Sequence, residues 1–460
     1  MTQNRLTKSI LLISLLLGSV VSCSPKNSSS SQKVESSNSD DSSGLVEFDT
    51  TNDVNILFYT TMGQTLQEVF NAYLEDFNQL YPNIHVSTQF IGGYDDVRDQ
   101  MNTEIAAGQS EVNIAYCYPD HIATYNTSKS VVALDEYIDN EKYGFSDEQI
   151  NDFVSAYFEE GYSLGDGKIY SLPFSKSSEV LYYNADVFTQ HNLQVPTKWF
   201  GENDPASMEY ACKTLKTLYP DSIPLGYDSE ANWFITMCAQ NNIPYTASTG
   251  ENYLFDNSEA KEFVSKFKEW FDRGWVTTKN LYAAYTSGLF VEKSSQRSFM
   301  TIGSSAGATH QQPKDNEFEV GITQIPQSDE TNKKVIQQGP NVCIFRNKDK
   351  QKELASWLFV KYFTTNVEFQ AQFSMVSGYT PVIKSVFEND IYKEFLNEEG
   401  NIQALSTKVC VEQEANYFTS PAFDGSSEAR EQVGNIIVQA FKGSKDINTI
   451  FADAVANCRG

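Results

Sequence analysis

Positive charge is scarce in this 460-residue sequence, in which 34 lysines and arginines stand against 60 aspartates and glutamates, a formal net charge of −26. A protein this acidic repels nucleic-acid phosphates and anionic lipid headgroups, so we expect neither as a partner. Histidine is scarce as well, with four residues far apart, and the seven cysteines include no C-x-x-C pair. This spacing provides no ligand set for zinc or an iron–sulfur cluster. We therefore expect no metal site and no cofactor.

The apolar run at the N-terminus is short. Arg5 and Lys8 precede an apolar stretch over 10–17, and small residues then lead to Cys23. This order predicts a secretory signal peptide over 1–22, which is too short to span a bilayer as a mature helix. A cysteine at its exit matches the bacterial lipobox. The pattern therefore predicts cleavage before Cys23, acylation of its sulfur, and a lipid anchor on the extracytoplasmic face of the cell membrane.

The residues after Cys23 have little to bury. Serine, asparagine, glutamine, aspartate and lysine dominate 24–43, so we predict a disordered tether over 23–44. About 415 residues follow, which fits two lobes of ordinary domain size. The other six cysteines are spread widely along these lobes. Export would permit disulfides, but this spread favours buried free thiols.

Apolar periodicity predicts an α/β fold with an open, mostly parallel sheet. Residues 55–60, 84–90 and 112–116 have strand patterns, and the intervening segments 66–80 and 95–107 have helical spacing. Strands that alternate with helices imply right-handed crossovers, with ligands bound beyond the carboxyl ends of the strands. Further helices are predicted at 206–218, 233–241, 258–273, 350–363, 366–373, 429–441 and 447–455.

Four segments in order resemble the extracellular solute-binding proteins of ATP-driven (ABC) importers. They are most similar to the carbohydrate group, which includes glycerol-3-phosphate-binding and maltose-binding proteins. The segments are Tyr-Thr-Thr-Met-Gly at 59–63 with Tyr81-Pro82, Asp-Gly-Lys-Ile-Tyr-Ser-Leu-Pro-Phe at 166–174 running into Leu-Tyr-Tyr-Asn at 181–184, Ser-Gly-Tyr-Thr-Pro-Val at 377–382, and the closing helix pair with Lys442-Gly443 between its helices.

The resemblance implies a two-lobe, periplasmic-binding-protein-like fold of type II, with a cleft between the lobes and hinge crossings. We expect lobe 1 over 45–175 plus 320–363, and lobe 2 over 178–318 plus 366–458. It also implies a monomer that captures a small ligand and delivers it to the transmembrane subunits of an ABC permease. That function is not enzymatic. The expected ligand is a sugar, an oligosaccharide or a polyol, with glycerol-3-phosphate or its diesters among the candidates.

The resemblance further implies a set of ligand contacts, because polyol hydroxyls need fixed donors and acceptors and sugar C–H faces stack on aromatic rings. Three positions depart from the family pattern. The family's acidic contact falls at Pro119 or Asp120, of which Asp120 is chosen; Arg430 lies two residues before the position of the family's phosphate-binding arginine; and Gly339 stands in Gln-Gly-Pro-Asn rather than Gly-Gly. The expected contacts are Tyr94, Asp120, Ser177 or Ser178, Trp233, Ser304 or Ser305, Gly339, Tyr379 and Arg430.

The alternative function is a surface lipoprotein that acts as an adhesin or a glycan-degrading enzyme. Gly303-Ser-Ser-Ala-Gly307 matches the G-x-S-x-G of a hydrolase nucleophile elbow. That chemistry needs a histidine further along the chain, and only His310 follows, five residues after Ser305. We therefore predict no catalytic residues.

Overall fold

The structure is a computed structural model that describes residues 45–292, 294, 297–443 and 445–460. The predicted signal peptide, the acylated Cys23 and the tether lie outside the described residues. Residues 45–460 form one compact unit. Within these described ranges, no helix combines the length and the apolar character that crossing a membrane requires.

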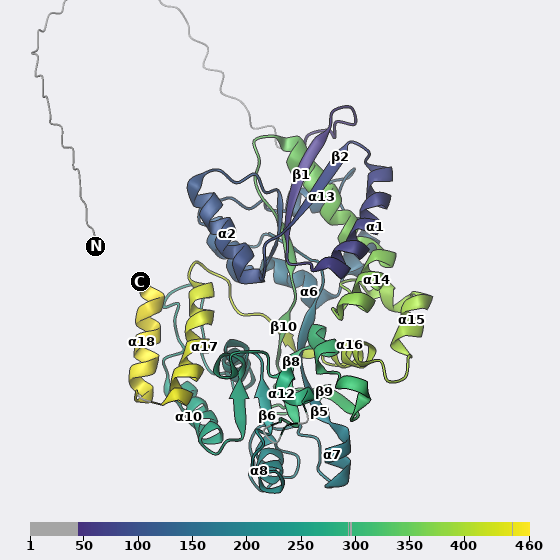
Figure 1. Cartoon of the computed structure of the whole chain (residues 1–460). Coiled ribbons are helices and arrows are strands. Elements are labelled where there is room, and N and C mark those ends of the chain that lie inside the picture. The colour runs from purple at the N-terminus through teal and green to yellow at the C-terminus, as the bar shows by residue number, and fades with distance from the viewer. Residues whose placement is uncertain (1–44, 293, 295–296, 444) are drawn as a thin grey trace, which may run out of the picture. The chain divides into compact units, whose positions relative to one another are not determined.

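The described residues contain two sheets, which occupy different regions of the unit (Figure 1). The first has five strands in the order β2-β1-β3-β11-β4. β1 pairs in parallel with β2 and β3, whereas β11 is antiparallel to β3 and β4. The bounds are β1 (Val54–Thr60), β2 (Ile84–Phe90), β3 (Ile114–Cys117), β4 (Leu172–Pro173) and β11 (Asn341–Ile344).

Helices α1 (Gln64–Leu80) and α2 (Tyr94–Ala107) connect the first three strands. The start of α2 is fixed by Asp96, whose carboxylate accepts a 2.7 Å hydrogen bond from the Gly93 N–H. Its end is fixed by Gly108, which adopts the left-handed conformation with φ of 64°. The residues between β2 and α2 therefore lie at the carboxyl end of β2, where a ligand is predicted to bind.

Helices α13 (Lys350–Thr365) and α14 (Val367–Ser377) complete the first core. Phe70 of α1 stacks on Phe363 of α13 with ring centroids 4.7 Å apart, and Phe359 packs edge-on against Phe77. Both α1 phenylalanines are fully buried. Burial of such rings is the main stabilising contribution to a core of this kind.

The second sheet is built around β5 (Ser177–Asn184), which is antiparallel to β8, β9 and β10. β6 is parallel to β7 and β8. The other strands are β6 (Leu225–Tyr227), β7 (Val276–Thr278), β8 (Met300–Ser304), β9 (Val320–Gln324), β10 (Val335–Gln338) and β12 (Tyr417–Phe418). Its helices include α7 (Ala185–Gln190), α8 (Met208–Leu218), α9 (Glu230–Gln240), α10 (Ser258–Asp272), α11 (Lys279–Tyr282), α12 (Ser287–Val291), α16 (Ile402–Glu412), α17 (Ser426–Lys442) and α18 (Ile447–Arg459).

Shorter segments join these elements. They are α3 (Pro119–Asn126), α4 (Asp135–Ile138), α5 (Asp147–Asp152), α6 (Ser155–Glu159), α15 (Asp390–Leu396) and the 3₁₀ helices η1 (Glu160–Tyr162), η2 (Ser305–Gln311), η3 (Lys314–Asn316), η4 (Lys384–Glu388) and η5 (Glu414–Asn416). The six described cysteines are free, and five of them are buried, as the sequence predicts.

The α/β fold and its two sheets agree with prediction, but the sheets are mixed rather than mostly parallel. The antiparallel pairings arise where the chain passes between the sheets. β4 belongs to the first sheet and β5 to the second, so one crossing lies at 174–176. Another lies at Gly339-Pro340, between β10 and β11, where glycine with φ of 89° turns the chain.

These pairings differ from the predicted lobe boundaries in two places. Residues 320–363 are predicted in lobe 1, yet β9 and β10 pair with β5 of the second sheet. Residues 366–458 are predicted in lobe 2, yet α14 packs on α1, and Phe369 and Phe373 lie in the core of the first sheet. The elements of each sheet therefore extend further along the chain than the boundaries that the resemblance implies.

Candidate functional site

A cleft of about 970 Å³ lies where loops from both sheets meet. Its first wall follows the carboxyl ends of β1, β2 and β3, at Thr61, Gly92–Asp96 and Tyr118–His121. Its second wall follows the carboxyl ends of β6 and β7, at Asp228–Ala231 and Lys279–Asn280. Ligands of open α/β sheets bind at such strand ends. The size suits a ligand larger than a single small polyol.

Tyrosine supplies all the aromatic lining of this cleft among the described residues. Tyr94 and Tyr379 come from α2 and from the turn after α14, and their hydroxyl oxygens are 2.9 Å apart. The ring of Tyr118 packs edge-on against Tyr94, with centroids 5.1 Å apart. Burial raises the pKa of both Tyr94 and Tyr379, so both hydroxyls stay neutral near pH 7. Tyr245 and Tyr285 complete the set.

Asp120 joins the two walls. The Ser427 hydroxyl, at the start of α17, donates a 2.9 Å hydrogen bond to the Asp120 carboxylate. Burial alone would raise the pKa of Asp120, but His121, Arg430 and the Ser427 hydrogen bond together lower it. Burial lowers the pKa of His121, which is therefore neutral near pH 7. The Asp120 carboxylate therefore keeps its negative charge near pH 7 although it is buried.

The second wall holds two more carboxylates in fixed positions. Asp228 accepts hydrogen bonds from the Thr286 backbone N–H and hydroxyl, each at 2.7 Å. Glu230 accepts from the backbone N–H and the side-chain amide of Asn280, at 2.9 and 3.2 Å. These bonds orient Asn280, which is exposed in the cleft. Nearby, Tyr285 is 60% exposed although it is aromatic.

A buried ion pair lies beside the cleft at the first crossing. Lys176 is fully buried and its ammonium contacts the carboxylate of Glu160, which lines the cleft and is 4% exposed. The same ammonium donates to the Gly339 carbonyl at 3.1 Å and to the Asn341 side chain at 3.3 Å. Asn341 in turn donates to Glu160 at 2.8 Å. One lysine therefore ties the two crossings together.

Four residues predicted as ligand contacts lie on the cleft. Tyr94, Asp120 and Tyr379 line the first wall, and Arg430 of α17 lines the second. The guanidinium of Arg430 donates to the side-chain oxygen of Asn232 on α9. The cleft therefore brings together residues that are up to 336 positions apart in the sequence.

The predicted serines and Gly339 lie outside the cleft lining and hold strands together. The Ser178 N–H donates to the Ser305 hydroxyl at 3.3 Å, and the Ser178 hydroxyl donates to the Ile336 carbonyl at 3.0 Å. The Ser304 hydroxyl donates to Ser177 at 3.2 Å. At Gly339 a Cβ would lie 2.4 Å from the Ser175 carbonyl oxygen, so this glycine is required by the crossing.

Trp233 is predicted as a stacking platform, and the structure places it in the core instead. It is fully buried, with its ring centroid 3.8 Å from Phe267 and 4.8 Å from Tyr227. The cleft is lined by its helix neighbours Ala231 and Ile235. Sequence position identified the right helix, but the helical rotation turns residue 233 to the opposite face.

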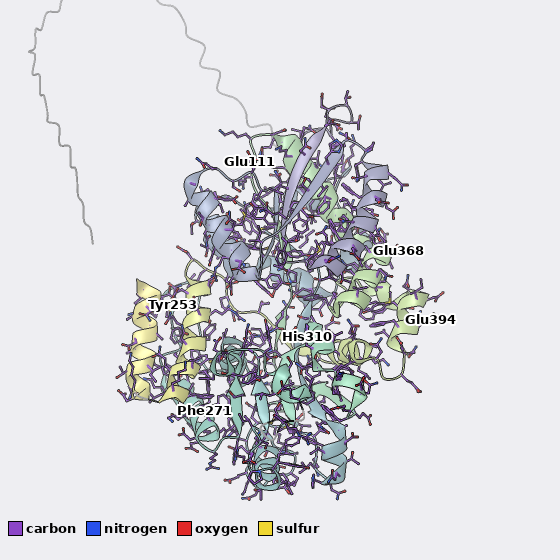
Figure 2. The ribbon with its side chains drawn as sticks, viewed as in Figure 1. Glu111, Tyr253, Phe271, His310, Glu368 and Glu394 are labelled. Atoms are coloured by element: carbon purple, nitrogen blue, oxygen red, sulfur yellow. The ribbon has the colours of Figure 1, made fainter. Side chains whose placement is uncertain are left out.

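The G-x-S-x-G segment does not form a catalytic pair. Ser305 is fully buried and accepts the hydrogen bond from Ser178. His310 belongs to the same short helix, η2, and is exposed (Figure 2). A nucleophile elbow requires an accessible hydroxyl facing a histidine from another loop. Across the described ranges, no group of three or more histidine, cysteine or acidic side chains could hold a metal ion.

Arg430 is the one predicted contact on the second wall, and the loops after β6 and β7 were not predicted. Asp228 and Glu230 follow β6, and Lys279 and Asn280 follow β7, but each of these strands has only three residues. Strands this short leave no detectable alternation. Tyr285 follows Ala283-Ala284 in a segment without a periodic pattern.

Comparison with known proteins identifies the family. The model of the bacterial extracellular solute-binding protein family matches residues 72–397. The sn-glycerol-3-phosphate-binding periplasmic protein UgpB of Rhizobium meliloti is 26% identical over 343 residues, which are 70% of this chain and 73% of that protein. UgpB of Escherichia coli K12 is 22% identical over 347 residues, or 72% of this chain and 75% of that protein.

Solved structures share the fold at lower identity. The ABC substrate-binding protein Lmo0181 of Listeria monocytogenes, in complex with cycloalternan, superposes with a TM-score of 0.71 at 16% identity. UgpB of Mycobacterium tuberculosis, in complex with glycerophosphocholine, has a TM-score of 0.70 at 16% identity. Each comparison covers 89% of this chain and 98% of the other. The two sheets, the cleft between their loops and the family match over 72–397 lead to one conclusion: this chain is a member of the bacterial extracellular solute-binding protein family.

Proposed function

We propose that this protein is the substrate-binding component of an ABC importer, which captures a sugar, an oligosaccharide or a polyol outside the cell and delivers it to the permease. The observation that carries the proposal is a cleft of about 970 Å³ between two walls, lined by five tyrosines: Tyr94, Tyr118, Tyr245, Tyr285 and Tyr379. A tyrosine offers a ring face for sugar C–H groups and a hydroxyl for sugar oxygens.

Capture of a ligand in this way requires the two walls to close on it, and few covalent links join them. Backbone crossings at 174–176 and at Gly339-Pro340 link the two sheets, and the Asp120–Ser427 hydrogen bond links their loops at the cleft. A ligand that contacts both walls stabilises the closed arrangement, and the permease then distinguishes closed from open molecules. The relatives support this class of cargo, since they include sn-glycerol-3-phosphate-binding proteins and a cycloalternan complex.

The proposal extends to location. Acylated Cys23 would hold the protein at the membrane as a monomer, with residues 23–44 as the tether. Replacing Cys23 with alanine is expected to release the protein from the membrane fraction, and mass spectrometry of the N-terminal peptide would show the loss of the lipid mass. A variant that stays in the membrane fraction would contradict the anchor and leave ligand capture unaffected.

Ligand capture is tested by a thermal-shift screen of the purified protein against mono- and oligosaccharides and polyols, with isothermal titration of each hit. A ligand that binds only the folded state raises the melting midpoint as its concentration exceeds its dissociation constant. Tyr285→Ala is expected to weaken binding about tenfold through lost ring contact. Tyr282→Ala is the matched control, because Tyr282 is also exposed, at 37%, and does not line the cleft. Equal effects of the two variants would contradict the assignment of this cleft.

A further inference from the structure

The charges of the cleft bear on the class of ligand. We infer that the cleft selects an uncharged, multiply hydroxylated carbohydrate and rejects phosphorylated ligands, an inference that rests on the proposed function. The relatives leave both classes of ligand open, since one is named for glycerol-3-phosphate and another forms a complex with cycloalternan.

Negative charge is in excess on the described lining. Three cations, Arg98, Lys279 and Arg430, stand against seven carboxylates. These are Asp95, Asp96, Asp120, Glu160, Asp228, Glu230 and Glu431. Glu160 is neutralised by Lys176 behind it, which leaves six carboxylates against three cations. A cleft between low-dielectric walls concentrates the field of such an excess, and this field opposes the entry of an anion.

Arg98 is already committed to the protein's own carboxylates. Its Nε donates to Asp99 at 2.8 Å and its Nη1 to Asp95 at 3.1 Å. Lys279 lies over the ring of Tyr285, 4.1 Å from the centroid. Burial raises the pKa of the nearby Asp228, and the hydrogen bonds from Thr286 and the charge of Lys279 oppose this rise. A phosphate would have to compete with these partners for either cation.

Arg430 is the cation that the family resemblance assigns to phosphate, and here part of its guanidinium is engaged. Its Nη2 donates to the side-chain oxygen of Asn232. Bidentate pairing with a phosphate takes two N–H donors, so a phosphate would have to bind Arg430 through its other nitrogens or displace Asn232.

The N-terminus of α17 is the other feature that could bind an anion. Helix N-termini attract phosphates through free backbone N–H groups and the helix dipole. α17 has 17 residues and its N-cap, Gly425, has no side-chain cap. The carboxylate of Asp120 lies beside this helix start, where it accepts a hydrogen bond from the Ser427 hydroxyl. Its negative charge opposes the binding of a second anion at the start of α17.

The lining also offers neutral groups to a ligand. They include the exposed amide of Asn280, which Glu230 orients, and the tyrosine hydroxyls and rings. Such groups bind hydroxyls and C–H faces and gain nothing from a phosphate. Size points the same way, because a cleft of about 970 Å³ exceeds what a glycerol phosphate fills.

The test measures neutral and phosphorylated probes on the same protein. The neutral probes are an array of oligosaccharides and polyols, and the phosphorylated probes are glycerol-3-phosphate, glycerophosphocholine and glucose-6-phosphate. We expect at least one neutral glycan to bind. Every phosphorylated probe should bind the protein about a hundredfold more weakly than that glycan, or not at all. Thermal shift identifies binding and isothermal titration measures the dissociation constants.

A charge variant tests the mechanism. Asp120→Asn keeps the shape of the side chain and removes the negative charge near Arg430 and the start of α17, so it should gain affinity for glycerol-3-phosphate by about tenfold. Asp228→Asn should produce a gain of the same sign without touching the contact between the walls. Glu394→Gln is the matched control, because Glu394 is an exposed carboxylate of α15 that lies at the outer edge of the molecule, outside the cleft lining (Figure 2).

The outcomes separate the inference from the proposed function. Binding of neutral glycans alone, with a gain for phosphate in both cleft variants, supports the inference. Tight binding of any phosphorylated probe to the unmodified protein overturns it and leaves solute capture standing. No binding of either class overturns carbohydrate capture, and the inference then falls with it. Equal phosphate affinity in Asp120→Asn, Asp228→Asn and Glu394→Gln would show that the cleft charges do not select the ligand.

Discussion

Replacing Lys176 with methionine would remove the cation of the buried pair at the crossing and leave the Glu160 carboxylate with only the Asn341 amide as partner. Both members are almost inaccessible to solvent, Lys176 at 0% and Glu160 at 4%. An uncompensated charge in such a place costs about 3–5 kcal/mol of stability. Folded proteins have only about 5–15 kcal/mol in total, so the loss is large.

A double-mutant cycle separates the cost of the unpaired buried charge from the cost of lost packing. Glu160→Gln alone leaves the Lys176 ammonium unpaired and should also cost about 3–5 kcal/mol. The double variant leaves no charge buried, and its cost should fall well below the sum of the two, with a coupling energy of about 2 kcal/mol or more. Methionine approximates the length of the lysine stem, so little volume is lost.

The assay is urea unfolding followed by far-ultraviolet circular dichroism and tryptophan fluorescence, with coincidence of the two signals checked first because two-lobe proteins can unfold in steps. The control is Lys393→Met, which breaks the exposed ion pair with Glu388 and should leave the unfolding midpoint unchanged. Single variants at Lys176 and Glu160 that each cost less than about 1 kcal/mol, with no coupling, would refute the reasoning.

Three further predictions concern other buried groups. Trp233→Ala should cost about 3–5 kcal/mol in urea unfolding through the cavity it leaves, while isothermal titration on the protein that remains folded shows unchanged ligand affinity. Gly339→Ala should lower the unfolding midpoint, because the new Cβ meets the Ser175 carbonyl and φ is 89°; an unchanged midpoint would argue against a required glycine. Burial raises the pKa of Glu179 from its ordinary 4.5 to about 7, so the folded state holds more protons than the unfolded state between these values, and stability falls as pH rises through that window. Glu179→Gln should lack this decline, which is about 3 kcal/mol, and urea midpoints at pH 5 and pH 8 measure it; parallel curves for the two proteins would contradict the shift.

How far the sequence predicts the structure depends on the length of each element. The helix predicted at 258–273 is observed at Ser258–Asp272, and the strand predicted at 84–90 is observed at Ile84–Phe90, because long periodic segments carry their own signal. The three-residue strands β6 and β7 carry none, and the second wall of the cleft follows them. Half of the site was therefore invisible to periodicity.

The family resemblance predicted other parts of the site, and its errors have a different cause. Tyr94, Asp120 and Tyr379, which it predicts as ligand contacts, line the cleft, because loops after the strands of the first sheet have recognisable neighbours. It placed Trp233 on the wrong face of α9, since a shift of one or two residues turns a helical side chain by about 100° each. It could not show that Arg430 donates to Asn232 or that Ser427 donates to Asp120, since these bonds depend on the packing of α17 against α9 and α3.

In the proposed mechanism, the Asp120–Ser427 contact also determines how much of the free energy of cleft closure the ligand must supply. The Ser427–Asp120 bond links the walls at the cleft, and a hydrogen bond to a charged group contributes about 1.5–3 kcal/mol. The protein's own contact is therefore small beside the free energy that shifts a two-state equilibrium almost completely, about 5.5 kcal/mol. The rest must come from ligand groups that reach both walls at once, from the tyrosines after β2 and α14 to Asn280 after β7. A ligand with several hydroxyls meets that requirement, whereas one that ends in a single charged group satisfies one wall only.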